Sequence, residues 1–186
     1  MAVTSQGIRS TLTRYLDHHP GEASELQPLL HALDTGADIT TRSGFSGGHV
    51  TCGAIVIDHD HRLLLIRHKA LNTWLLPGGH LEPSDACLPA AAGRELAEET
   101  GISWHDAIAP AAHDAVPVDI DVHAIPANPA KDEPAHWHAD FRYAFWVREP
   151  RIRIQLTEVD GYSWQPPGNA PTPRLAAKII SLPAPA

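Results

Sequence analysis

The sequence has few cysteines, no long apolar run and fewer basic than acidic residues. Cys52 and Cys87 are the only cysteines among 186 residues, too few for a disulfide framework and typical of a reducing compartment. The opening MAVTSQGIRSTLTRYL has no apolar signal-peptide core, and no stretch approaches the ~18 apolar residues of a membrane helix. The 14 Lys and Arg against 22 Asp and Glu give a formal charge of −8, which disfavours non-specific DNA binding because phosphates attract basic surfaces. We therefore expect a cytoplasmic protein that neither enters a membrane nor binds DNA non-specifically.

The residues that are present suffice for a folded domain with a helical extension. Hydrophobic residues make up 43% of the chain, enough for a core. Two amphipathic helical stretches fall within residues 5–36, separated by Pro20-Gly21 and ended by Gly36. They could form a lid, a homodimer element or a packed extension, and packing is the default for amphipathic helices. We divide the chain into an N-terminal helical extension, residues 1–36, and a main domain, residues 37–186.

Alternating and helical periodicities predict the elements of the main domain. Helices are expected over residues 88–100, which Gly101 ends, and over residues 172–182. A period of two in β-rich segments is typical of half-buried strands. The mixture predicts an α/β or α+β fold with a mixed sheet and few helices. The strands are expected at residues 50–57, 62–68, 116–124, 137–147 and 152–156.

Three glutamates share one face of the helix predicted over residues 88–100. Glu95, Glu98 and Glu99 stand at i, i+3 and i+4, where like charges repel. They also lie near the C-terminal end of the helix, where the dipole disfavours each anion by about 0.3–1 kcal/mol. A divalent cation would offset both costs, and carbonyls of the preceding Pro77-Gly78-Gly79 turn could approach it. The alternative is a solvated acidic face.

This loop and helix resemble the signature box of the Nudix hydrolases in the run GGHLEPSDACLPAAAGRELAEETGI. The family pattern is Gly, five residues, Glu, seven residues, then Arg-Glu-apolar-x-Glu-Glu-x-Gly-apolar. Its second half matches at every fixed position from Arg94 to Ile102, whereas Asp85 replaces the first Glu and one residue is inserted before Arg94. Asp85 or Glu82 would then hold Arg94. The resemblance covers roughly residues 49 to 165 and implies a Nudix-type α/β/α sandwich with a mixed β-sheet.

The resemblance implies a metal-dependent hydrolase of small nucleotide-type molecules. Arg94 would orient the carboxylates of the box, and Glu98 or Glu99 would be the general base. The implied reaction is hydrolysis of a phosphoanhydride in a nucleoside diphosphate linked to another moiety, in which metal ions neutralise phosphoryl charge. The groups that would bind the catalytic Mg²⁺ or Mn²⁺ are the carboxylates of Glu95, Glu98 and Glu99 and the carbonyl of Gly79.

Polar residues outside the box add further candidates. Glu158 lies where Nudix enzymes often carry another metal-binding or basic glutamate, with a plain loop acid as the alternative. Period-two alternation also places two sets of polar side chains each on one strand face. We assign substrate binding to the first set, although a solvated sheet face is the alternative for both. The first set is His138, Asp140 and Arg142, and the second is Asp119, Asp121 and His123.

The 13 histidines raise the question of a zinc site. No HExxH pair occurs, and Cys52 and Cys87 have no CxxC spacing. The sequence therefore predicts no dedicated zinc site.

Two other classes of function compete with the hydrolase. One is a Nudix-like domain that binds a nucleotide as a sensor without hydrolysing it, and the inserted residue of the box favours it. The other is an interaction domain that works through residues 1–36. Intact Glu95, Glu98 and Glu99 favour the enzyme, because a pure binder has no need of mutually repelling acids.

Overall fold

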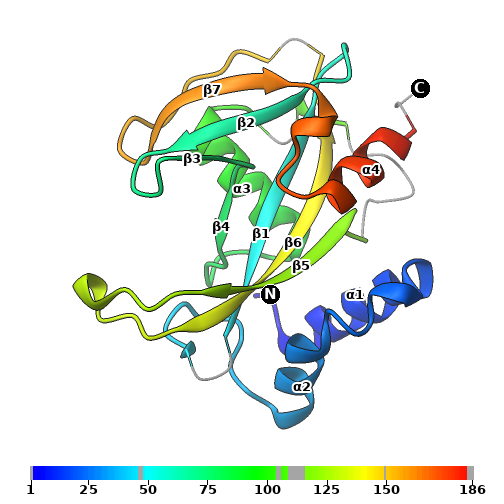
Figure 1. The fold of residues 1–186 in the computed structure, drawn as a ribbon, viewed down its shortest axis with the longest axis vertical. Helices are drawn as coiled ribbons and strands as arrows, with labels where there is room; N and C mark the ends of the chain where they lie inside the picture. Colours follow the sequence, from blue (N-terminus) through cyan, green and yellow to red (C-terminus); the bar gives the residue numbers. More distant parts are fainter. Residues whose placement is uncertain (1, 46–47, 104–105, 109–115, 149, 184–186) are drawn as a thin grey trace.

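A computed structural model describes residues 2–45, 48–103, 106–108, 116–148 and 150–183. None of the helices in these ranges is long and apolar enough to cross a membrane. The helices of more than one turn are α1 (Ser5–His18), α2 (Gln27–Thr35), α3 (Leu88–Thr100) and α4 (Pro173–Ser181) (Figure 1). The strands are β1 (His49–Ile57), β2 (Leu63–His68), β3 (Thr73–Leu75), β4 (Gly78–His80), β5 (Asp119–Ile125), β6 (His136–Trp146) and β7 (Val159–Gln165).

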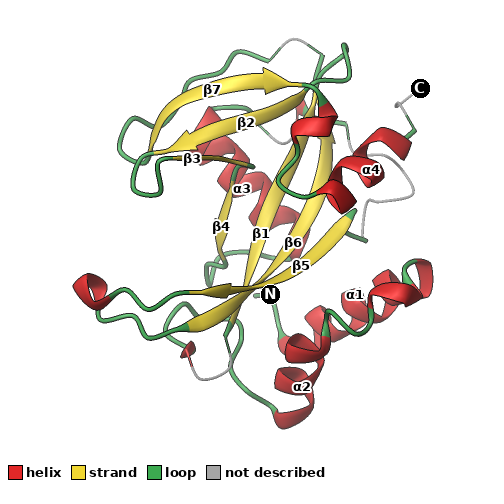
Figure 2. Ribbon diagram, viewed as in Figure 1, coloured by secondary structure: helices red, strands yellow, loops and turns green. Residues whose placement is uncertain are grey.

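The strands form the expected mixed sheet around β1. Strand β1 runs parallel to β6 over its whole length, and the other pairings are antiparallel. The order is β3-β2-β1-β6-β5, with β4 beside the first half of β1 and β7 beside β2. Figure 2 shows β4 and β6 flanking the same end of β1. This end carries the polar groups described below.

Helices cover both faces of the sheet, which confirms the α/β/α sandwich. Val50, Cys52 and Ala54 of β1 point to the face covered by α3 and the N-terminal helices, in the larger of two buried clusters. Ile55 and Ile57 point to the other face, where they pack with apolar residues of α4. Alternate residues of one strand therefore serve two cores, as expected for a central strand buried on both sides.

The N-terminal helices form as the sequence predicts. The hydroxyl oxygen of Thr4 accepts a hydrogen bond from the Gly7 backbone nitrogen and caps α1. Gly36 ends α2 with φ of 70°, a left-handed conformation that favours glycine. Ile8 and Leu12 are buried in the same cluster as the sheet and α3. The division at residue 36 stays a prediction, but these helices share the main core.

The prediction of a strand at residues 152–156 is wrong. Residues 151–155 have no regular secondary structure. The backbone nitrogens of Arg153 and Gln155 instead donate to the carbonyls of Thr100 and Glu99, at 2.7 and 3.1 Å. The last carbonyls of a helix have no partner within the helix. This extended segment therefore donates hydrogen bonds to the carbonyls at the end of α3 instead of pairing with a strand.

Candidate active site

The acidic face of α3 is fixed by the way the helix packs on β1 and β4. Pro89 occupies the first turn, where its missing N–H costs nothing, and Gly101 ends the helix with φ of 71°. Leu96 is fully buried against the sheet. On the neighbouring part of the helix surface Glu99 is buried, whereas Glu98 is about half exposed. The acidic face therefore runs from the protein interior to solvent.

Glu95 and Glu99 lie against the backbone of β4. The Gly78 nitrogen donates a hydrogen bond of 2.9 Å to Glu99 Oε2. A Cβ atom placed on Gly79 would lie 2.5 Å from Glu95 Oε1, a distance that real side chains do not reach. Glycine at position 79 therefore allows the carboxylate to approach the strand, and it puts Gly79 beside the acidic face as the sequence predicted.

Arg94 joins the loop before the helix to the acidic face. Its Nε and Nη2 donate to the two carboxylate oxygens of Asp85, at 3.0 and 3.1 Å. Its Nη1 donates to Glu95 and Glu98, at 3.0 Å in each case. Glu82 lies farther away, with its Oε2 3.9 Å from Arg94 Nε. Of the two partners left open by the sequence, Asp85 is thus the one that holds Arg94 in a two-pronged ion pair.

The loop folds back so that the shorter Asp85 side chain reaches Arg94. Asp85 Oδ2 accepts a hydrogen bond of 2.7 Å from the Glu82 nitrogen, and the Asp85 nitrogen donates to the Glu82 carbonyl at 3.0 Å. The Asp85 carbonyl also accepts a 3.1 Å bond from the nitrogen of Val3, in the N-terminal extension. The Asp replacement and the inserted residue therefore leave the Arg94 contacts in place.

Burial and neighbouring carboxylates disfavour the ionised forms of Glu95 and Glu99. Burial raises the pKa of Glu99 to about 8, and the neighbouring carboxylates of Glu95, Glu158 and Glu98 add to the rise. Burial likewise raises the pKa of Glu95 to about 7, partly opposed by Arg94. Carboxylate and carbonyl oxygens are the ligands that Mg²⁺ and Mn²⁺ prefer, so this set of groups fits a hard divalent cation.

The charge of Glu158 affects Glu99 of the box. It lies exposed in the turn that precedes β7, and its carbonyl accepts a 2.8 Å hydrogen bond from the Lys69 nitrogen. Its charge contributes to the raised pKa of Glu99. The structure thus groups the glutamates at positions 95, 98 and 99, and membership of Glu158 in this group stays a prediction.

The two predicted polar strand faces lie side by side, because β5 pairs with β6. Residues Asp119, Asp121 and His123 stand opposite Arg142, Asp140 and His138 in register. Arg142 is almost fully buried, and its terminal nitrogens contact three carboxylates. These are Asp119 at 3.0 Å, Asp121 at 2.9 Å and Asp140 at 3.1 Å. The guanidinium therefore holds the two strands together through ion pairs.

This ion-pair network extends to α4. Lys178 Nζ and Arg174 Nε donate to the buried carboxylate of Asp119, at 2.9 and 3.2 Å. Lys178 also donates to the hydroxyl of Tyr15 in α1, at 2.5 Å. No pattern in the sequence predicts these partners, because they come from helices at opposite ends of the chain.

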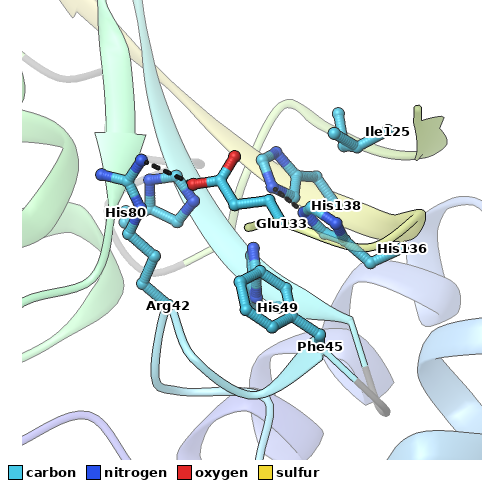
Figure 3. Close-up of a pocket in the computed structure, with 8 residues that line it drawn as sticks. All are labelled: Arg42, Phe45, His49, His80, Ile125, Glu133, His136 and His138. Atoms are coloured by element: carbon cyan, nitrogen blue, oxygen red, sulfur yellow. Dashed lines mark hydrogen bonds and ion pairs between the residues drawn. The ribbon is translucent and has the colours of Figure 1, made fainter. Parts of the chain in front are cut away.

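Histidines gather at the far end of the same polar face. A cavity of about 40 Å³ opens there, and in Figure 3 the imidazole rings lie around it beside an ion pair between Arg42 and Glu133. Sequence reasoning singled out only His138 from this set. Strand alternation on β1 could have signalled His49, which shares a face with Thr51. The lining residues are Arg42, Phe45, His49, His80, Ile125, Glu133, His136 and His138.

Comparisons with known proteins place the chain in a family. The NUDIX domain family model matches residues 47–182. A probable DHNTP pyrophosphohydrolase from Lactococcus lactis subsp. cremoris (strain MG1363) is 35% identical over 105 residues, which are 56% of this chain and 58% of that protein. A putative 8-oxo-dGTP diphosphatase from Bacillus subtilis (strain 168) is 40% identical over 47 residues, 25% of this chain and 31% of that protein. The chain thus spans less than two thirds of either relative.

Solved structures agree on the fold. The crystal structure of a C. elegans Ap4A hydrolase binary complex superposes with a TM-score of 0.56 at 15% identity, covering 71% of this chain and 95% of that one. Identity this low speaks for a shared fold alone. The family match is stronger, because it covers residues 47–182, well over half of the chain, and this range contains the run from Gly78 to Ile102. The chain belongs to the Nudix family.

Proposed function

We propose that this chain is a Mg²⁺- or Mn²⁺-dependent pyrophosphohydrolase. Its reaction is hydrolysis of a phosphoanhydride in a nucleoside diphosphate linked to another moiety. The observation that carries the proposal is the acidic face of α3, where Arg94 holds Glu95 and Glu98 in place and Glu99 lies buried against β4. Burying carboxylates that raise each other's pKa costs free energy, and a helix face that only contacted solvent would gain nothing to offset that cost.

The residues that would hold the cation are those with oxygen atoms on this face. When bound, the cation neutralises charge on the phosphoryl oxygens and activates a water for in-line attack. Arg94 would keep two carboxylates aligned, since it contacts Glu95 and Glu98 through one nitrogen and is itself fixed by Asp85. The proposed ligands are the carboxylates of Glu95, Glu98, Glu99 and Glu158 and the carbonyl of Gly79.

The proton from the attacking water needs a carboxylate base. Burial raises the pKa of Glu99 to about 8, and the Gly78 nitrogen fixes its orientation. Glu98 is more accessible, since its side chain is 48% exposed. General bases work best when their pKa lies near the operating pH and they reach the proton. Glu98 and Glu99 are both retained as candidates for this role.

The substrate class is proposed from the relatives. One relative is described as a DHNTP pyrophosphohydrolase and another as an 8-oxo-dGTP diphosphatase, which favours a nucleotide-type triphosphate. Substrate binding by His138, Asp140 and Arg142 stays a prediction. Within that set, the ion pairs of Arg142 support a positioning role, whereas His138 and Asp140 are only partly buried.

A substrate panel tests the proposal. The purified chain is incubated with nucleoside triphosphates, dihydroneopterin triphosphate, nucleotide sugars, ADP-ribose and dinucleoside polyphosphates, with Mg²⁺, Mn²⁺ or EDTA. We expect metal-dependent release of pyrophosphate or a nucleoside monophosphate from at least one triphosphate. Tight binding of one compound without turnover on any would instead support the sensor. The homodimer and the cytoplasmic location expected from the sequence stay predictions.

A further inference from the structure

Four histidines converge where three neighbouring strands end together. His49 begins β1, His80 ends β4, and His136 and His138 begin β6. Ring centroids of His49, His80 and His138 are separated by 5.0, 4.7 and 5.0 Å, so the three rings form a nearly equilateral triangle. One nitrogen from each of these three lies within 4.8 Å of the others. Figure 3 shows the rings turned toward the small cavity between them.

The hydrogen bonds of the cluster leave nitrogen lone pairs available. The His136 Nδ1 contacts the Pro134 carbonyl at 2.8 Å. A carbonyl only accepts, so Nδ1 carries the proton and the neutral ring has a lone pair on Nε2. An imidazole whose other nitrogen donates to a carbonyl is the arrangement that metal-ligating histidines use. His49 is 1% exposed, and its Nδ1 is buried with no hydrogen-bond partner among the described residues.

Distances within the cluster suit a tetrahedral ion. The Nε2 atoms of His136 and His138 lie 3.2 Å apart and form a hydrogen bond, so a proton lies between them where an ion could bind. Two nitrogens bound at 2.0–2.1 Å to one tetrahedral zinc ion are about 3.3–3.4 Å apart. Imidazole binds a metal ion through a nitrogen lone pair, which the neutral ring has.

The cavity has room for an ion but not for a nucleotide. Its volume is about 40 Å³. One water needs about 10–15 Å³ on this scale, whereas pockets for small organic ligands are about 300–1,000 Å³. Arg42 and Glu133 pair at 3.2 Å beside the cavity, so their charges largely cancel. The size of the cavity therefore favours a metal ion with at most a few waters.

From this geometry we propose a second metal site, made by His49, His80 and His138 and bordered by His136, that binds a borderline transition-metal ion such as Zn²⁺. Imidazole ligands suit Zn²⁺, Cu²⁺ and Ni²⁺, whereas oxygen ligands suit Mg²⁺ and Mn²⁺. The site lies on the opposite sheet face from α3, since His80 shares its face with Thr51 while Cys52 pairs with Gly79. It is thus separate from the proposed catalytic cation.

A second group of possible metal ligands around His138 is less available to bind an ion. His123 and Asp140 also come within 4.8 Å of a His138 nitrogen. However, His123 Nδ1 already pairs with Asp121 at 3.3 Å, and Asp140 accepts from Arg142 and from Thr51. The group that includes His49 and His80 therefore has the freer lone pairs.

This proposal departs from the expectation of no zinc site, and the sheet topology explains why. The ligands stand at positions 49, 80 and 138, far apart in sequence. They meet because β1 lies between β4 and β6, with His49 in register with His138 and Thr51 with His80. Spacing motifs detect ligands on one helix or loop, so they miss ligands that only a sheet brings together.

Zinc binding to the full chain tests the site. The purified protein is treated with EDTA, desalted and titrated with ZnCl₂ in excess Mg²⁺, which occupies the carboxylate site. We expect one tightly bound zinc ion per chain. Replacing one ligand in His80→Asn or His138→Asn should weaken zinc binding by about 10- to 100-fold or more. His31→Asn, which changes an exposed histidine of α2, is the matched control and should bind like the unaltered protein.

A spectrum of the unaltered protein keeps the test independent of whether the variants fold. Co²⁺ in a four-coordinate histidine site absorbs visible light strongly, whereas Co²⁺ in a six-coordinate carboxylate site absorbs weakly. We expect the strong bands. Weak bands, or zinc affinity equal in the His80→Asn and His31→Asn variants, would overturn the proposal. Glu99→Gln should keep zinc binding, so loss of hydrolysis and loss of the zinc site are separable.

Discussion

At Glu99, an amide would remove the charge of the side chain while keeping its shape. In Glu99→Gln the amide oxygen can still accept the hydrogen bond from the Gly78 nitrogen, now 2.9 Å long. Loss of a metal ligand or of the general base should lower kcat by about 10²–10⁴-fold. We expect the melting temperature to stay the same or rise, because a buried carboxyl that resists ionisation is gone. Steady-state kinetics and thermal denaturation measure both.

Glu25→Gln serves as the control for this substitution. Glu25 is 61% exposed and pairs with Arg174, remote from the box. Its variant should keep kcat within about twofold, because exposed ion pairs contribute little. Near-normal turnover in Glu99→Gln would contradict both proposed roles of Glu99.

The raised pKa values of Glu95 and Glu99 predict a pH-dependent stability in the metal-free protein. The folded state keeps protons that the unfolded carboxyls release near their ordinary pKa of 4.5, so the stabilisation is lost as pH rises through about 7 and 8. His49, His80 and His138 act oppositely, because their pKa values are lowered from 6.5, but their contribution is complete above pH 6.5. The carboxyls therefore dominate between pH 6.5 and 8.5.

In EDTA, the melting temperature should fall across that window by on the order of 5 °C. Added Mg²⁺ should restore much of the loss at pH 8.5 and little at pH 6.5, because the cation favours the ionised carboxylates. Glu99→Gln should show a shallower fall. A metal-free protein whose melting temperature is constant from pH 6.5 to 8.5 would contradict the electrostatic account of the site.

At the scale of the element, the loop before α3 determines how Arg94 points. Asp85 is buried and contacts Arg94 through both oxygens. Asp85→Asn should destabilise the protein by about 1–3 kcal/mol, because it removes the charged acceptor of two buried hydrogen bonds while Arg94 keeps its contacts with Glu95 and Glu98. We also expect a higher Mg²⁺ concentration for half-maximal activity, since Arg94 then aligns Glu95 and Glu98 less well. Urea denaturation and metal-dependent kinetics measure these effects.

Glu82→Gln is the matched comparison within the same loop. Its carboxylate is mostly exposed and lies 3.9 Å from Arg94, so its loss should change stability by less than about 1 kcal/mol. If Glu82→Gln raised the Mg²⁺ requirement as much as Asp85→Asn, the assignment of Asp85 as the partner of Arg94 would be wrong.

The elements differ in how far the sequence predicts them. Residues 88–100 form the predicted helix to the residue, because Pro89, the apolar stripe and Gly101 all act locally. Residues 152–156 have the alternation of a strand, yet their backbone groups meet the end of α3. The alternation reports one buried side of an extended segment, and it cannot tell whether a strand or a helix end lies beside it.

The contacts of the candidate sites also differ in how far the sequence predicts them. Arg94 and Glu98 stand one turn apart on α3, at i and i+4, so helical spacing predicts their contact. The Arg142 ion pairs and the histidine cluster depend on which strands are neighbours in the sheet. Sheet order is set by tertiary packing, which the periodicity of a single strand does not encode.

For the molecule as a whole, the shared core predicts that residues 1–36 unfold together with the sheet. Leu12 of α1 is 1% exposed and belongs to the same buried cluster as Leu96 of α3. Leu12→Ala should cost about 2–5 kcal/mol and lower the melting temperature by about 5–15 °C in one cooperative transition. Leu71→Ala is the control, since Leu71 is 63% exposed and its loss should change stability by less than about 0.5 kcal/mol. If the helices were an independent unit, Leu12→Ala would leave the main transition in place and create a second, lower one, which differential scanning calorimetry would resolve.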